Sequence, residues 1–180
     1  MKATGIVRRI DELGRVVIPK EIRKTLRIKE GDPLEIYTDK EEVLFRKYSP
    51  IASIETSAGA LCEAVREVTD KTVLLFDCDS VIAAAGKDVK NLVGEPVSEE
   101  LERILTERTM KVANLSEGDV IVPLFRRDIL TLSSEVVVPV VSNGDLLGGV
   151  AIISKEDGSF GEVELLIAKC TAAFLARQFE

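Results

Sequence analysis

The sequence predicts an α+β protein built from two domains. Short runs of β-branched residues between turn residues alternate with segments whose apolar residues recur every three or four positions. Tyr48-Ser49-Pro50 interrupts this alternation, so we expect one domain over residues 1–50 and a second over residues 51–180. A chain of 180 residues is long enough for two small domains.

The first domain is predicted to contain two small hairpins joined by one short helix. Pro19 suits the first turn of a helix over residues 19–28, and Gly31 suits its end. A turn at residues 11–14 separates the strands of the first hairpin. In chain order the strand signals fall at residues 4–10, 15–18, 34–37 and 43–46.

A unit of this size buries too little apolar surface to be secure alone. It has no disulfide pair or metal site that could stabilise it. Oligomerisation is the remaining common remedy, so we expect the first domain to fold as a dimer.

Charge is divided unevenly along the chain, whose net charge is -7. Residues 1–30 hold nine basic and four acidic residues, a net charge of +5. Residues 51–180 hold 12 basic and 22 acidic residues, a net charge of -10. A basic head on an acidic body favours a polyanionic partner at the N-terminal end. The alternative is that short segments simply fluctuate in charge.

The second domain is predicted to combine antiparallel strands with flanking helices. Asn143-Gly144 suits the tight turn of a hairpin between residues 135–141 and 146–154. Ser98 can cap a helix that carries Leu101, Ile104 and Leu105, while Ser159 and Glu162 resemble the capping box of the last helix. Further strands are expected at residues 73–76, 81–85 and 120–125.

The first and last helices of this domain have apolar stripes that suggest assembly. The last helix carries two stripes, and a helix that is apolar on two sides is buried on two sides. One stripe can cover the sheet of the domain, and the other needs a second helix. We therefore predict that chains associate through a helical seam formed by Ile54, Leu61, Val65, Val68, Leu165, Ala172, Leu175 and Phe179.

The composition argues against an enzyme and predicts no cofactor. Histidine is absent, which removes the commonest general base and metal ligand. Cys62, Cys78 and Cys170 lack the spacing of a metal or redox pair, so we interpret them as small buried residues, with Cys78 the most exposed. No apolar run approaches a membrane span and no signal peptide is apparent, so we expect a cytoplasmic location.

The stretch GIVRRIDELGRVVIPKEIRKTLRIKEGDPLEIY resembles the DNA-binding domain of AbrB-type transition-state regulators. The resemblance implies a dimer of swapped hairpins that binds double-stranded DNA through Arg8, Arg15 and Arg23. Lys24 replaces a fourth family arginine, which keeps the charge but loses the bidentate fork. Lys2 and Arg9 are further basic candidates. Asp11 and Glu12 are expected to orient Arg15 or to close the turn, the alternative being a direct contact to a cytosine base.

The second domain resembles a GAF domain, on the strength of the pattern at residues 73–85, the 133–154 hairpin and the ending AAFLARQFE. An AbrB-type head on a GAF domain is an arrangement of sporulation regulators in spore-forming bacteria. It implies a homotetramer that activates some genes and represses others. Because GAF domains often hold small molecules, Arg126, Arg127 and Asp128 are candidates for the mouth of a ligand pocket, the alternative being a polar loop.

Two other functions fit parts of the sequence. An AbrB-type antitoxin has the same head, but its tail is disordered, whereas residues 51–180 here have caps and hairpins. Some GAF domains reduce methionine sulfoxide through cysteines, which would give Cys78 a catalytic role. The leading hypothesis remains a sequence-specific transcription regulator.

Overall fold

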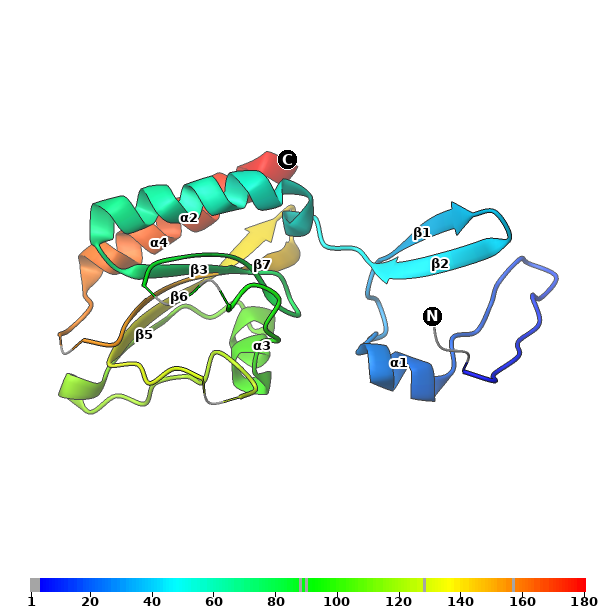
Figure 1. Ribbon diagram of the computed structural model, residues 1–180, viewed down its shortest axis with the longest axis horizontal. Helices are drawn as coiled ribbons and strands as arrows, with labels where there is room; N and C mark the ends of the chain where they lie inside the picture. The colour runs from blue at the N-terminus through cyan, green and yellow to red at the C-terminus, as the bar shows by residue number, and fades with distance from the viewer. Residues whose placement is uncertain (1–3, 88, 90, 128, 157) are drawn as a thin grey trace. The chain divides into compact units, whose positions relative to one another are not determined.

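The computed structural model describes residues 4–87, 89, 91–127, 129–156 and 158–180 (Figure 1). The chain divides into two compact units, Met1–Tyr48 and Ser49–Glu180. Each unit has its own elements.

The N-terminal unit consists of one short helix and one hairpin. Helix α1 spans Lys20–Leu26, and strands β1 (Leu34–Asp39) and β2 (Glu42–Lys47) pair antiparallel. The expected end of the helix at Gly31 is wrong, because Arg27 takes the left-handed conformation first, with φ 55°. Its N–H reaches the carbonyl of Lys24, which closes the last turn four residues before the glycine.

The strands expected at residues 4–10 and 15–18 do not form within one chain. The described residues on either side of the 11–14 turn have no neighbouring strand. Apart from Pro19, no apolar side chain of residues 4–48 is buried, and Val7 is 83 % exposed. One copy of this unit therefore lacks a hydrophobic core.

The C-terminal unit is built on a five-stranded antiparallel sheet with the order β4-β3-β7-β6-β5. The chain enters through the 3-10 turn η1 (Ile51–Ile54). Its strands are β3 (Thr72–Phe76), β4 (Val81–Ala85), β5 (Lys111–Asn114), β6 (Ser134–Ser142) and β7 (Asp145–Ser154). The sequence did not predict β5, a four-residue strand at the edge of the sheet.

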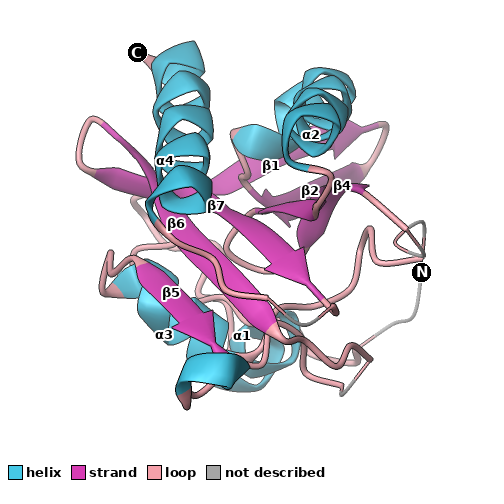
Figure 2. Ribbon diagram, turned by 90° about the vertical axis from the view of Figure 1, so that its left-hand side faces the viewer, coloured by secondary structure: helices cyan, strands magenta, loops and turns pink. Residues whose placement is uncertain are grey.

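Helices cover both faces of this sheet (Figures 1 and 2). Helices α2 (Glu55–Thr69) and α4 (Glu162–Ala176) lie side by side on one face, and α4 packs on β6 and β7. Helix α3 (Glu99–Thr106) covers the other face with apolar side chains. Two short 3-10 turns, η2 (Leu115–Glu117) and η3 (Arg177–Phe179), follow β5 and α4.

Local signals place the turns and caps of this unit. Asn143 and Gly144 both have positive φ, 50° and 88°, as a type I′ turn requires, and they join β6 to β7 as predicted. The Ser98 hydroxyl accepts the Leu101 N–H at 2.9 Å, which confirms the cap of α3. Helix α4 begins later than expected, because its N-cap is Gly161 and not Ser159. The Gly161 N–H donates to the Glu164 carboxylate at 2.9 Å.

The strand expected at residues 120–125 is also wrong. Only Phe125 forms a bridge, with Val97, and the rest of the segment crosses the sheet face without ladder pairing. Its backbone bonds go elsewhere: the Val122 N–H goes to the Glu135 side chain, and the Pro123 carbonyl accepts from the Ser98 hydroxyl. A run of β-prone residues thus became a covering segment whose backbone groups bond outside the sheet ladder.

The predicted assembly seam is mostly the core of a single chain. Leu175 is 1 % exposed, and Val65 and Ala172 are buried with it. Ile54, Leu61, Leu165 and Phe179 pack against the same core, so Val68 is the seam residue that stays exposed. The other apolar stripe of α4 faces solvent, with Val163, Leu166 and Phe174 more than half exposed.

Within the described ranges, no helix is long and apolar enough to cross a membrane, and no group of three or more acidic or cysteine side chains could hold a metal ion.

The core assignment predicts a clear contrast between two leucines of the C-terminal unit. Leu175→Ala should cost about 2–5 kcal/mol in the free energy of unfolding, because it leaves a cavity under α4. Leu115→Ala, at a half-exposed leucine of η2, should cost less than about 0.5 kcal/mol. Urea denaturation measures both, and equal costs would contradict the assignment.

Candidate nucleic-acid interface

A tight turn at residues 11–14 presents Arg15. The Asp11 N–H and the Arg15 carbonyl are 3.0 Å apart, and the Gly14 N–H donates to the Asp11 carbonyl at 2.9 Å. One carboxylate oxygen of Asp11 accepts the backbone N–H groups of Leu13 and Arg15, at 3.0 and 2.8 Å. Gly14 has φ +75°, a conformation that glycine adopts without strain.

The second carboxylate oxygen of Asp11 holds the Arg15 side chain. Arg15 Nε lies 2.8 Å from Asp11 Oδ2, which confirms that Asp11 orients the arginine. The backbone hydrogen bond from Arg15, followed by the side-chain one, lowers the pKa of Asp11, so the carboxylate stays ionised at neutral pH. Because the ion pair uses Nε, the two terminal nitrogens of Arg15 are left to meet another acceptor.

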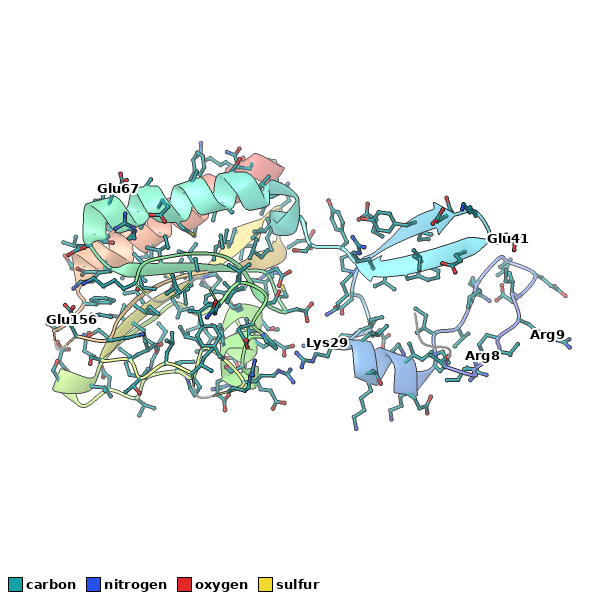
Figure 3. All side chains as sticks on the ribbon, viewed as in Figure 1. Arg8, Arg9, Lys29, Glu41, Glu67 and Glu156 are labelled. Carbon is teal, nitrogen blue, oxygen red and sulfur yellow. The ribbon has the colours of Figure 1, made fainter. Side chains whose placement is uncertain are left out.

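The other predicted cations lie before and after this turn. Arg8 and Arg9 are exposed on the segment leading into it (Figure 3). Lys24 is exposed on α1, and Arg23 beside it is half-buried. Lys2 lies outside the described residues. The turn thus brings Arg8, Arg9 and Arg15 onto one short stretch of chain, with the helical cations following Pro19.

The hairpin of the N-terminal unit carries a polar cluster that the sequence analysis missed. The Arg46 guanidinium lies 5.0 Å from the centre of the Tyr37 ring, in a cation–π arrangement. The Tyr37 hydroxyl donates to the Glu35 carboxylate, and this bond raises the pKa of Tyr37. Arg46 pairs opposite Glu35 in the hairpin, so it reaches Tyr37 diagonally across the two strands, which the strand composition alone does not indicate.

The C-terminal unit has a hollow of about 470 Å³ lined by residues 121–127 and 129–132, called the 121–132 hollow below. Arg126 and Arg127 lie at it, but both are already engaged. Arg126 Nε donates to the Val97 carbonyl at 3.2 Å, and Arg127 Nη2 meets both carboxylate oxygens of Glu95 at 2.7 and 2.8 Å. Asp128 lies outside the described residues.

Among the described residues none of the three cysteines forms a disulfide, and they differ in environment. Cys62 is buried, and burial raises the pKa of its thiol to about 12. Cys78 is partly exposed, and its thiol faces the Leu146 carbonyl at 3.8 Å. The expectation that Cys170 is packed is wrong, since it lies on the exposed stripe of α4. The structure brings no two of these thiols together as a pair.

The two units define a class of protein: a transcription regulator with a basic N-terminal unit and a separate α+β domain. Residues 53–180 match the family model described as "Stage V sporulation protein T C-terminal, transcription factor". Over the full chain the sequence is 46 % identical to stage V sporulation protein T of Bacillus subtilis strain 168, covering 99 % of that protein. The chain belongs to the stage V sporulation protein T family.

The N-terminal unit has relatives of its own. Residues 7–53 match the family model "Antidote-toxin recognition MazE, bacterial antitoxin". The chain is also 44 % identical to the transition state regulatory protein AbrB of the same Bacillus strain. The 88 aligned residues cover 49 % of this chain and 83 % of that protein. The antitoxin match ends where the C-terminal unit begins, whereas the similarity to the sporulation protein runs through both units.

Solved structures confirm the GAF fold. A GAF domain of an Acinetobacter phosphoenolpyruvate-protein phosphotransferase is 14 % identical, with a TM-score of 0.57, over 68 % of this chain and 80 % of that one. A free methionine-R-sulfoxide reductase from Thermoplasma acidophilum is 15 % identical, with a TM-score of 0.55, over 71 % of this chain and 93 % of that one. At these identities the likeness concerns the fold alone, and the family is that of a transcription factor rather than an enzyme.

The geometry of the turn predicts opposite effects of removing its two acidic residues. Asp11→Ala should weaken DNA binding roughly 5- to 30-fold, because a charge-assisted bond that positions Arg15 is lost. Glu12→Ala removes the same charge beside the same turn and should leave binding equal or stronger. Titration of a labelled promoter fragment with each variant measures this, and equal gains for both would show that Asp11 acts through its charge alone.

Proposed function

We propose that the protein binds double-stranded DNA through a dimer of its N-terminal units and so controls the transcription of sporulation genes. The observation that carries this proposal is a basic unit whose apolar side chains stay exposed in one chain while an internal ion pair positions Arg15. The name of its full-length relative, stage V sporulation protein T, supports the role in sporulation.

Dimerisation follows from the energetics of the N-terminal unit. Val7, Ile10, Leu13 and Val17 are between 68 % and 83 % exposed, and the hairpin strands expose Ile36, Val43 and Phe45 as well. Burying a side chain of this kind contributes about 1.5–3 kcal/mol. A second copy that interleaves its strands with the first would supply both the missing core and the missing strand partners of residues 4–18.

The arginines are assigned to DNA by their exposure and position. Arg8, Arg9 and Arg15 can reach phosphate oxygens or base edges from the turn, and in a dimer each occurs twice. Arg23 and Lys24 extend the basic surface onto α1. Lys24 acts as a point charge toward phosphate, because an ammonium group lacks the planar fork that reads a guanine edge.

The C-terminal unit is proposed to join two dimers into a homotetramer. Its exposed stripe on α4, formed by Val163, Leu166, Cys170 and Phe174, is the apolar surface that replaces the seam expected from the sequence. Heads and bodies would then have separate interfaces, and two kinds of interface in one chain build a tetramer. A tetramer carries two DNA-binding heads and gains avidity for DNA. We propose that it activates some genes and represses others.

A ligand of the GAF-like unit belongs to the same proposal. The hollow at residues 121–132 would hold a small molecule against Ile121, Leu124 and Leu130. Its arginines are engaged with Val97 and Glu95, so binding would compete with internal bonds. We place the protein in the cytoplasm, where DNA is available to it.

Arg15→Ala should lower DNA affinity without dissociating the dimer. If each protomer loses one phosphate contact, the slope of log K against log salt should fall by roughly two per dimer. Fluorescence anisotropy at several salt concentrations gives both affinity and slope, with size-exclusion chromatography as the check on the dimer. Arg177→Ala, an exposed arginine at the end of the other unit, should change neither. An unchanged slope for Arg15→Ala would remove it from the interface.

Replacing both Leu166 and Phe174 with glutamate should convert a tetramer to a dimer while the fold is kept. Both side chains are more than half exposed, so two charges there cost little within one chain but several kcal/mol inside an interface. Lys169→Glu changes the net charge of the same helix by the same amount and should leave the tetramer intact. Multi-angle light scattering measures the mass, and a double variant that stays tetrameric would place the assembly surface elsewhere.

A further inference from the structure

Glu135 is a carboxyl group buried within the C-terminal sheet. It lies on β6 opposite Ala113 of β5 and Ile153 of β7, and it is 0 % exposed. Side chains alternate along a strand, so Glu135 shares a face with Val137, which is the face that α3 covers. A carboxyl group so placed is costly unless its charge is matched by partners.

Glu135 has too few hydrogen-bond donors around it to stabilise a buried negative charge. Oε1 accepts the Val122 N–H at 2.7 Å, and Oε2 has no hydrogen-bond partner among the described residues. Asp119 lies on the same covering segment, but its carboxylate accepts the Asn114 N–H, and Arg127 is bound to Glu95. Helix α3 meets this face with Leu101, Ile104 and Leu105, and the facing residue of β7 is apolar. Lys111 of β5 is the charged group that acts on Glu135.

The segment that Glu135 holds is fixed by the buried side chains Val122, Leu124 and Phe125 and by few backbone hydrogen bonds. Residues 119–125 have no ladder pairing except the bridge between Val97 and Phe125. Near its start the Asp119 N–H reaches the Asn114 carbonyl at 3.1 Å, and at its end the Ser98 N–H reaches the Leu124 carbonyl at 3.0 Å. Between these points, the Val122 N–H donates to Glu135 and the Pro123 carbonyl accepts from the Ser98 hydroxyl. The same segment forms one wall of the 121–132 hollow.

We propose that Glu135 is a proton-dependent latch: its neutral form keeps residues 119–125 closed over the sheet, and its ionised form favours their release. Neutral Glu135 can keep Oε1 as acceptor for Val122 while the proton sits on Oε2. When Glu135 is ionised, its buried charge is stabilised only by the Val122 N–H and by Lys111. Moving residues 119–125 away from the sheet lets water reach that charge. Release would also open the hollow.

The direction of the pH effect follows from linkage. Burial raises the pKa of Glu135 from 4.5 to about 7, against the opposing effects of the Val122 hydrogen bond and Lys111. A raised pKa means that the closed state binds the proton more tightly than an open, hydrated state. The closed state is therefore fully favoured below pH 4.5 and loses that advantage as the pH rises through 7. If the open state has an ordinary pKa, the opening equilibrium constant should rise about tenfold between pH 6 and pH 8.

Hydrogen exchange of the full-length protein tests the latch. After correction for the intrinsic pH dependence of exchange, amides of residues 119–125 should lose about tenfold in protection between pH 6 and pH 8, while amides of β7 keep theirs. Glu135→Gln should abolish this change, since the amide does not titrate. Glu117→Gln, an exposed carboxylate just before the segment, should retain it.

A second measurement stands even if Glu135→Gln does not fold. The carboxyl carbon of Glu135 in the unaltered protein, followed by NMR, should titrate with the same midpoint as the loss of protection. A midpoint below pH 5, or protection of residues 119–125 that stays constant from pH 6 to pH 8, overturns the proposal. A loss of protection shared equally by β7 also overturns it, because the effect would then be global stability and not a local latch.

Discussion

The absence of a core in the N-terminal unit constrains everything that the protein does. Residues 4–48 expose their apolar side chains, and residues 4–18 have no strand partner in one chain. In the proposed dimer, folding of this unit and its association with a second copy would therefore be one event. The same event would duplicate Arg8, Arg9 and Arg15 across a twofold axis, so a DNA surface of useful size would exist only in the assembled form.

Within that proposed surface, Asp11 adds a negative charge, but it also fixes the position of the Arg15 side chain. An acidic residue close to DNA weakens binding by repulsion, but the pair is solvent-exposed, where a single repulsive charge is screened over about 8 Å at physiological salt. The bonds from Asp11 to the backbone of Leu13 and Arg15 fix the turn itself. A guanidinium held in one orientation loses less entropy on contact with phosphate than a free one, so positioning outweighs repulsion.

The sequence predicted the elements whose signals are local and failed where tertiary partners decide. Asn143-Gly144 and Ser98 depend on their own conformational preferences, and both behave as expected. Residues 120–125 have the composition of a strand, but the Val122 N–H is taken by a side chain of β6 that no local pattern connects to it. The two stripes of α4 were visible, yet periodicity does not say which one the sheet takes. Ala168 and Ala172 let the helix approach β6 closely, and this packing choice reversed the expected surfaces.

The single chain lacks two stabilising interactions that a partner molecule or the solvent would have to supply. The N-terminal unit lacks apolar contacts, which a second copy can provide. Glu135 lacks a partner for its charge among the valines of β6, and a proton meets that deficit at the least cost, since it removes the charge without moving the backbone. The first deficit makes the fold depend on protein concentration and the second makes part of it depend on pH. The large apolar core shared by α2, α4 and the sheet depends on neither, and it can tolerate a buried carboxyl group of this cost.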